Sequence, residues 1–199
     1  AFSRQYPDAL AIKADVTDAA ARRAMLDAVA ERFGRLDILV NNAGTFVERS
    51  FLQGTDAIRD LDQEVALNLT APIHLTGEVL QRWRNLEALV YVSSGFALVS
   101  PARAPTYGAV KAGLHAFAEG LRRQLAPNAT HVLEVLPPMV DTQMNAQRDG
   151  RKMTPAEVAE VTLKALAQRR PLALPGDTRL LPTMLRIAPK TIERMVGRL

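Results

Sequence analysis

Cysteine is absent from the 199 residues, and histidine, aromatic residues and long apolar runs are scarce. Without cysteine the chain forms no disulfides and no thiolate metal sites, which is compatible with a reducing cytosol. The three histidines, His74, His115 and His131, lie far apart and form no short ligand cluster, so we expect no metal centre. No segment approaches the roughly 18 apolar residues that cross a bilayer, and the first residues do not resemble a signal peptide. We therefore expect a cytoplasmic protein.

The excess positive charge lies at one end of the chain. Residues 178–199 contain five basic and one acidic side chain, and residues 1–177 contain 20 of each sign, which together give the formal net charge of +4. A nucleic-acid-binding domain usually concentrates lysine and arginine on one face with interleaved aromatic residues. Here the body is neutral and only 5% of the residues are aromatic, so we expect no nucleic-acid partner.

Short apolar runs alternate with amphipathic segments along the body. Helical spacing of apolar residues predicts helices over 19–33, 55–83, 106–125 and 157–167, with Pro72 marking a kink or break and a capping box at Thr154 and Glu157. Aliphatic and β-branched runs predict strands over 10–16, 37–40, 88–92, 131–136 and 172–174. The alternation predicts an α/β fold, a doubly wound Rossmann-like parallel sheet in one domain over residues 1–177, with ligand sites at the carboxyl ends of the strands.

Tyr107 and Lys111 stand four residues apart, which places a phenol and an ammonium on one face near the start of a helix. A free tyrosine titrates at about pH 10. An ammonium about 4 Å away contributes a gross attraction of about 4 kcal/mol, enough to bring the pKa of the tyrosine toward neutrality. This pair predicts a general base, although in isolation such a pair more often marks a solvated helix face.

The ends of two predicted strands carry small polar residues. Asn42, Ala43 and Gly44 follow one strand, and Ser94 follows the next, 13 residues before Tyr107. Strand ends of a parallel sheet lie at one edge, so these residues are expected to be neighbours. An Asn-Asn-Ala-Gly turn, an asparagine in the next helix, a serine 13 residues before a tyrosine and Tyr-x-x-x-Lys together resemble the short-chain dehydrogenase/reductase family. The match runs from about residue 10 to residue 142.

The resemblance implies a role for each member of the set. Tyr107 would exchange the proton of the substrate hydroxyl or carbonyl, and Ser94 would hydrogen-bond that oxygen. Lys111 would lower the pKa of the tyrosine and hold the nicotinamide ribose, while Asn68 would support a water chain from the lysine to solvent. Taken singly, Asn68 is otherwise a polar residue on a helix surface and Ser94 a turn serine.

The same resemblance implies a nicotinamide cofactor, NAD or NADP, whose hydride chemistry the protein orients. Asp15 matches the position that meets the adenine ring, although an aspartate there is also an ordinary turn or cap residue. After the strand at 131–136, Pro138 replaces a family glycine and removes one backbone N–H group. The cofactor-binding residues expected on this basis are Asp15, Asn42, Ala43, Gly44, Tyr107, Lys111, Pro137 and Thr142.

One family feature is missing from the sequence. The family opens with a strand, a glycine-rich turn and a helix whose N-terminus binds the pyrophosphate, and no Gly-x-x-x-Gly-x-Gly motif occurs here. We therefore expect the domain to lack its first strands and the natural protein to be longer. The residue that selects NAD or NADP belongs to that missing part, so the sequence does not choose between them.

The expected function is oxidoreduction of a small alcohol or carbonyl compound. Two alternatives use the same fold: a cofactor-binding regulator or scaffold without turnover, and a lyase or epimerase that forms product without net oxidation of the cofactor. Family members pair through the helices corresponding to residues 55–83 and 106–125, so the resemblance also implies a homodimer or homotetramer.

The substrate wall is expected from residues 45–52, 95–105 and 144–153. In the last segment, Arg148, Arg151 and Lys152 are expected to form a solvated lid, with an anionic substrate or a cofactor phosphate as the alternative partner. The tail, residues 178–199, reads as a basic amphipathic helix that packs on the protein or on a partner subunit, with contact to an anionic membrane surface as the alternative. Pro137-Pro138 and the ending at 185–189 resemble family members grouped by name with teichoic-acid D-alanylation, which identifies no substrate.

Overall fold

A computed structural model of the chain describes residues 6–52 and 58–197. Its centre is a parallel sheet of four strands in the order β1-β2-β3-β4. The strands are β1 (Ile38–Asn41), β2 (Ala88–Val92), β3 (His131–Val135) and β4 (Leu172–Ala173). Strands β2 and β3 are buried almost throughout, as expected for aliphatic runs in a parallel sheet with helices on both faces. The predicted α/β fold is confirmed.

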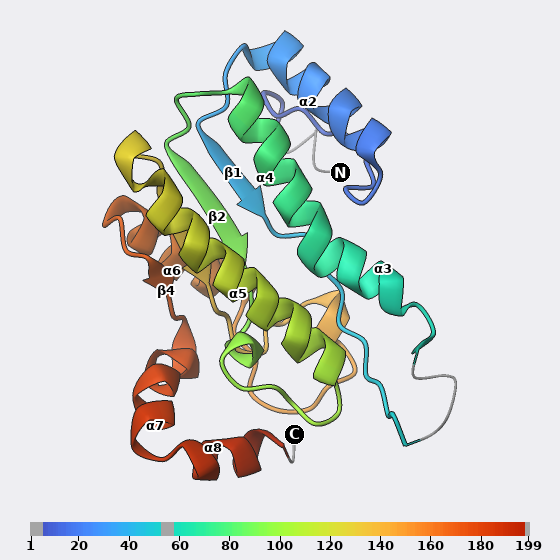
Figure 1. Ribbon diagram of the computed structural model, residues 1–199, viewed down its shortest axis with the longest axis vertical. Helices are drawn as coiled ribbons and strands as arrows, with labels where there is room; N and C mark the ends of the chain where they lie inside the picture. Colours follow the sequence, from blue (N-terminus) through green and yellow to red (C-terminus); the bar gives the residue numbers. More distant parts are fainter. Residues whose placement is uncertain (1–5, 53–57, 198–199) are drawn as a thin grey trace.

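Two long helices cover one face of the sheet, α4 (Ala71–Arg82) and α5 (Pro105–Leu125), and they lie side by side in Figure 1. Their apolar stripes meet the sheet in a core built around Leu89, Tyr91 and Leu114. The hydroxyl of Tyr91 lies 2.7 Å from that of Thr76 on α4, so the one polar atom of this ring is satisfied inside the core.

Helix α6 (Pro155–Ala167) covers the other face, where Val90, Leu133 and Ala165 share a second apolar cluster. The predicted capping box begins this helix. The Thr154 hydroxyl accepts from the backbone N–H of Glu157 at 3.2 Å, and the Glu157 carboxylate accepts from the N–H of Thr154 at 2.7 Å. These reciprocal bonds satisfy two backbone donors at the helix start, so the prediction is confirmed.

Helix α2 (Ala19–Phe33) agrees with the prediction, with Asp18 accepting from the N–H of Ala20 at its start and Gly34 at φ 70° ending it. The strand predicted over 10–16 is wrong, because this stretch forms no regular secondary structure and belongs to no sheet. A strand needs the hydrogen bonds of a neighbouring strand, and among the described residues none lies beside it. Strand β1 is therefore the edge of the sheet as described, with Val40 half exposed.

The helical segment predicted over 55–83 starts later and contains a local irregularity. Residues 55–57 lie outside the described residues, and the helix runs as α3 (Leu61–Val65), the π-helical turn η2 (Ala66–Thr70) and α4. Pro72 lies in the first turn of α4, where its missing N–H costs little. The interruption expected at Pro72 is thus the wide π turn directly before it.

The tail forms two helices instead of one. The 3-10 helix η6 (Gly176–Leu180) leads into α7 (Leu181–Ile187), and α8 (Pro189–Val196) follows, with Pro189 at the break. Ile192 and Val196 of α8 are buried against Val99, which follows the 3-10 helix η3 (Gly95–Ala97). The Ile192 and Val196 side of α8 therefore packs on the protein's own body, whereas Ile187 and Met195 of the tail are exposed. Within the described ranges, none of the helices has both the length and the apolar character that spanning a membrane requires.

Candidate active site

Tyr107 and Ser94 line the same cavity, which has a volume of about 690 Å³. Tyr107 stands in the first turn of α5, which begins at Pro105, a residue whose fixed φ suits a helix start. Ser94 follows β2 and caps η3 by accepting a hydrogen bond from the N–H of Phe96 at 3.1 Å. Because that bond uses an acceptor site of Ser94, its hydroxyl proton remains for Tyr107, with which Ser94 hydrogen-bonds, or for a ligand in the cavity.

Burial controls the ionisation of Tyr107. The pKa of Tyr107 is raised because burial penalises the phenolate, and this outweighs the hydrogen bonding to Ser94 and the positive charge of Arg148, which both lower it. The carboxylate of Glu64 raises the pKa further. The expectation that Lys111 brings the pKa toward neutrality is therefore wrong for this geometry. The phenol is protonated at neutral pH.

Lys111 lies one helical turn beyond Tyr107 and is almost fully buried. Its ammonium donates to the carbonyl oxygen of Val92 at 3.0 Å and lies 5.6 Å from the centre of the Tyr107 ring. Burial lowers the pKa of Lys111 to about 8, while the negative charge of Glu134 acts in the opposite direction. The lysine thus sits under the end of β2, on the same side of the helix as the tyrosine.

Asn68 holds the turn that follows β1. Its Nδ2 donates to the carbonyl oxygens of Thr45 at 3.0 Å and Glu64 at 3.1 Å, and its Oδ1 accepts from the N–H of Thr45 at 3.2 Å. The π turn η2 carries this buried side chain. The hydrogen bonds of Asn68 therefore brace the backbone next to Gly44.

Gly44 has no room for a side chain. A Cβ built there would lie 2.8 Å from Oδ1 of Asn68 and 3.7 Å from Nζ of Lys111. We predict that Gly44→Ala displaces Asn68 and destabilises the fold by about 1–3 kcal/mol, as overpacking usually does. Gly77→Ala is the matched control, because a Cβ there meets nothing within 4 Å and an exposed helical glycine gains about 0.5–1 kcal/mol on becoming alanine. Urea unfolding of both variants measures the difference; equal stability would contradict the close contact at Gly44.

The other proposed cofactor residues occupy three different settings. Asn42 and Ala43 line a small hollow of about 50 Å³, together with Val16. Pro137 lines the large cavity, and its carbonyl accepts from the N–H of Gly95 at 3.2 Å. Thr142 is exposed just before the 3-10 helix η5 (Gln143–Asn145), with its hydroxyl 3.5 Å from the carbonyl of Val140. Their expected contacts with a cofactor stay predictions.

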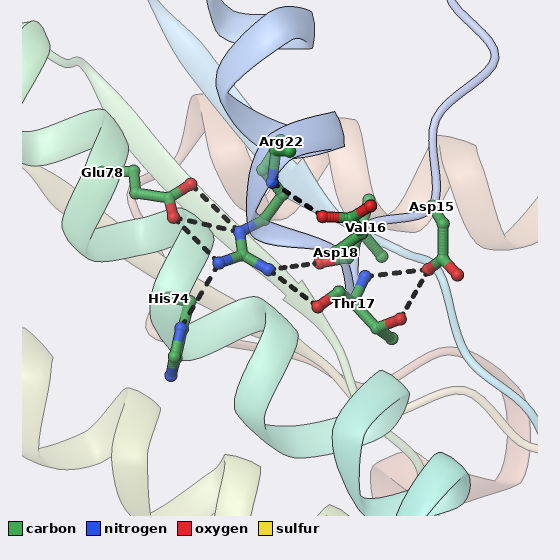
Figure 2. Close-up of polar contacts among 8 residues, drawn as sticks. Asp15, Val16, Thr17, Asp18, Arg22, His74 and Glu78 are labelled. Carbon is green, nitrogen blue, oxygen red and sulfur yellow. Dashed lines mark hydrogen bonds and ion pairs between the residues drawn. The ribbon is translucent and has the colours of Figure 1, made fainter.

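Asp15 is exposed and serves as a turn residue, because its Oδ1 accepts from the N–H and the hydroxyl of Thr17 at 2.9 and 2.7 Å. The backbone hydrogen bond from Thr17 is the main reason that the pKa of Asp15 is lowered. Figure 2 shows the buried Arg22 of α2 beside this turn. The Arg22 guanidinium donates to the carbonyl oxygens of Val16 and Thr17 at 2.9 and 3.2 Å.

The same guanidinium reaches across to α4. It pairs with Glu78 at 2.9 Å and lies 3.3 Å from Nδ1 of His74 (Figure 2). Sequence reasoning missed Arg22, although its spacing carried a signal. It stands four residues before Leu26, so both occupy the buried stripe of α2.

A second buried ion pair supports the wall of the cavity and was also missed. Nε of Arg49 lies 3.1 Å from Glu64 of α3, and both side chains are at most 2% exposed. Glu64 also accepts from the hydroxyl of Thr106 at 2.7 Å, directly beside Tyr107. The backbone N–H of Arg49 donates to the carbonyl of Arg103 at 2.9 Å. This pair therefore joins three segments around the start of α5.

Comparison with known proteins agrees with this geometry. The family described as "short chain dehydrogenase" matches residues 2–152. An uncharacterized oxidoreductase of Bacillus subtilis, DltE, is 36% identical over 154 residues, which cover 76% of this chain and 61% of that protein. The chain thus spans less than two thirds of the length of this relative.

Solved structures show the same fold. A short-chain dehydrogenase from Burkholderia cenocepacia in complex with NADP superposes with a TM-score of 0.82 at 23% identity, covering 93% of this chain and 77% of that one. One from Sphingobium yanoikuyae in complex with NADPH gives 0.74 at 25% identity, covering 91% and 73%. The family match extends over well more than half of the chain and includes the cavity residues Ser94 and Tyr107. The chain belongs to the short-chain dehydrogenase family.

Proposed function

We propose that the protein is an NAD- or NADP-dependent oxidoreductase that transfers a hydride between the cofactor and a small alcohol or carbonyl compound, with Tyr107 exchanging the proton. The observation that carries the proposal is the convergence of Ser94 and Tyr107 on one cavity, with the buried Lys111 one turn further along the same helix. The relatives crystallised with NADP and NADPH support the choice of cofactor.

The residues present fit the nicotinamide end of such a cofactor. The position that a Cβ would take on Gly44 lies 3.7 Å from Nζ of Lys111, so the turn after β1 and this cation would face the same ribose. The ammonium of Lys111 uses one of its three N–H groups on Val92 and retains two for ribose hydroxyls. When bound, the nicotinamide supplies or takes up the hydride.

The chain's own residues handle the oxygen of the substrate. Ser94 donates its hydroxyl proton as a hydrogen bond to this oxygen and orients it toward Tyr107. The phenol of Tyr107 gives its proton to the oxygen during reduction and takes it back during oxidation. The rings of Phe46 and Phe96, with centres 4.7 and 6.4 Å from that of Tyr107, pack against the tyrosine and hold its ring in place.

The raised pKa of Tyr107 leads to a prediction about pH. Because burial keeps the phenol protonated, we expect reduction of a carbonyl to proceed at full rate at neutral pH and to slow as the pH rises through the pKa of Tyr107. Oxidation of the alcohol needs the phenolate and should accelerate over the same range. Profiles of kcat/KM against pH in both directions measure this; a reduction that accelerates or an oxidation that slows as the pH rises would contradict it.

A spectrophotometric assay tests the proposal as a whole. The protein is mixed with NADH or NADPH and a panel of aldehydes and ketones, and the loss of absorbance of the reduced cofactor is followed. We expect turnover of at least one carbonyl compound with one of the two cofactors. Cofactor binding without turnover would favour a regulatory role, and product formation without cofactor oxidation would favour a lyase or epimerase.

We further propose that the protein assembles as a homodimer or homotetramer through the outer faces of α4 and α5. The outward face of α5 carries small residues, Ala109, Ala112, Ala116 and Gly120, which allow helices of neighbouring subunits to approach closely. Helix α4 lies beside α5 in Figure 1, so the two helices would contribute neighbouring parts of the interface.

A further inference from the structure

Two arginines line the cavity together with Tyr107 and Ser94. Arg103 belongs to the turn before α5, and Arg148 belongs to the segment after η5, so they reach the cavity from different parts of the chain. Their side chains are 35% and 21% exposed. Both cations are therefore partly withdrawn from water, where a charged ligand is held more strongly than on an open surface.

Both guanidinium groups gather around Phe46 and one carboxylate. The guanidinium carbon of Arg148 lies 3.9 Å from the centre of the Phe46 ring and that of Arg103 lies 5.8 Å from it. Oε1 of Glu48 lies 3.1 Å from Arg148 and 3.5 Å from Arg103. Each guanidinium carries five N–H groups. The single carboxylate of Glu48 therefore leaves several N–H donors of the two arginines, and one of their two positive charges, for a ligand.

The cations stand close to the reacting position. The centre of the Phe46 ring lies 4.7 Å from that of Tyr107. The positive charge of Arg148 lowers the pKa of the Tyr107 phenol. A group held by the arginines would thus lie in the same cavity as the Tyr107 side chain. Much of the remaining wall is apolar, with Phe96, Val99, Met139, Leu181 and Val196.

Two further carboxylates also line the cavity, Asp149 and Asp177. Both aspartates are exposed, so water screens their charges. The arginines are half-buried and packed on Phe46, and Glu48 already orients them. The charges of the two arginines are therefore less screened by water than those of the two aspartates.

We propose that the substrate of this site is an oxo acid or the corresponding hydroxy acid, with its carboxylate bound by Arg103 and Arg148 and its carbonyl or hydroxyl oxygen at Ser94 and Tyr107. This inference rests on the proposed function, because it uses the same cavity and the same reacting oxygen. Paired N–H groups of a guanidinium bind a planar carboxylate with two parallel hydrogen bonds, which supplies both affinity and orientation.

The test compares an acid with its neutral ester. Levulinate and methyl levulinate carry the same ketone, and kcat/KM is measured for both with the wild type and with the double variant Arg103→Met, Arg148→Met. We expect the wild type to prefer the acid and the double variant to lose about tenfold to hundredfold more on the acid than on the ester, as hydrogen bonds to charged groups are worth. The ratio of the two substrates removes any effect on Tyr107 itself, whose pKa Arg148 also lowers. Arg151→Met, an exposed arginine outside the cavity lining, is the control and should keep the preference.

A binding measurement separates this inference from the proposed function. Calorimetry with benzoate and benzamide should show benzoate binding that the double variant loses, whether or not any ketone is turned over. The proposal of an anionic substrate is overturned if the ester is turned over with no preference for the acid, or if the double variant still binds benzoate. Either result leaves the oxidoreductase proposal standing. Benzoate binding without turnover of any carbonyl compound overturns the oxidoreductase proposal and leaves the anion site.

Discussion

Tyr107→Phe is expected to lower kcat by about 10²–10⁴-fold, the usual contribution of a positioned proton donor, while affinity for the cofactor stays nearly unchanged. The substitution removes only the phenolic oxygen, which faces the cavity beside Ser94. The ring still packs against Phe46 and Phe96, so the wall of the cavity is kept. Steady-state kinetics together with a fluorescence titration of the reduced cofactor measure the two quantities separately.

Tyr91→Phe is the matched control for this experiment. Tyr91 is fully buried in β2, where its hydroxyl bonds to Thr76 inside the core and away from the cavity. Loss of that hydroxyl should lower stability by about 1 kcal/mol, the net worth of a typical hydrogen bond, without reducing turnover. If Tyr107→Phe kept kcat within a few-fold of the wild type, another group would have to supply the proton and the proposed role of Tyr107 would be wrong.

Arg49→Met is expected to cause the largest loss of stability, about 3–5 kcal/mol, because it leaves the buried carboxylate of Glu64 without its ionic partner. For a chain of this size such a loss lowers the Tm by roughly 6–20 °C. The start of α5 should loosen as well, since Glu64 also accepts from Thr106. Thermal unfolding followed by circular dichroism measures the shift.

Two further variants show whether the buried charge is the cause. Arg49→Met combined with Glu64→Leu removes both charges. Replacing a buried ion pair by apolar residues is often neutral or stabilising, so the double variant should regain most of the decrease in Tm caused by Arg49→Met alone. Arg35→Met breaks the exposed pair with Asp37 and should leave the Tm unchanged. A double variant as unstable as Arg49→Met alone would locate the effect in packing instead of in the unpaired carboxylate.

Local rules explain why most elements were predictable. The capping box of Thr154 and Glu157, the cap at Asp18 and the helical spacing in α5 depend on residues within a few positions of one another. Three buried strands were recognisable from short aliphatic runs at β2, β3 and β4. The stretch 10–16 also contains aliphatic residues but forms no strand, because strand formation depends on a partner that composition does not reveal.

The candidate site was predictable in its residue types but not in its charges. The pairing of Tyr107 with Lys111 follows from their spacing on one helix, and Ser94 follows from its place after a strand. The ion pair of Arg49 with Glu64 and the gathering of Arg103 and Arg148 around Glu48 join segments far apart in the chain. Their spacing along the sequence carries no sign of these contacts.

The sequence by itself determined the α/β class, the order of most elements and the identity of the reactive side chains, because helix periodicity, capping and strand composition act over short distances along the chain. Only the tertiary structure decided the ionisation of the site. Burial raises the pKa of Tyr107 and lowers that of Lys111 to about 8. Desolvation and charge–charge interaction depend on what surrounds a group in space, and those neighbours come from β2, α3 and the segment after η5.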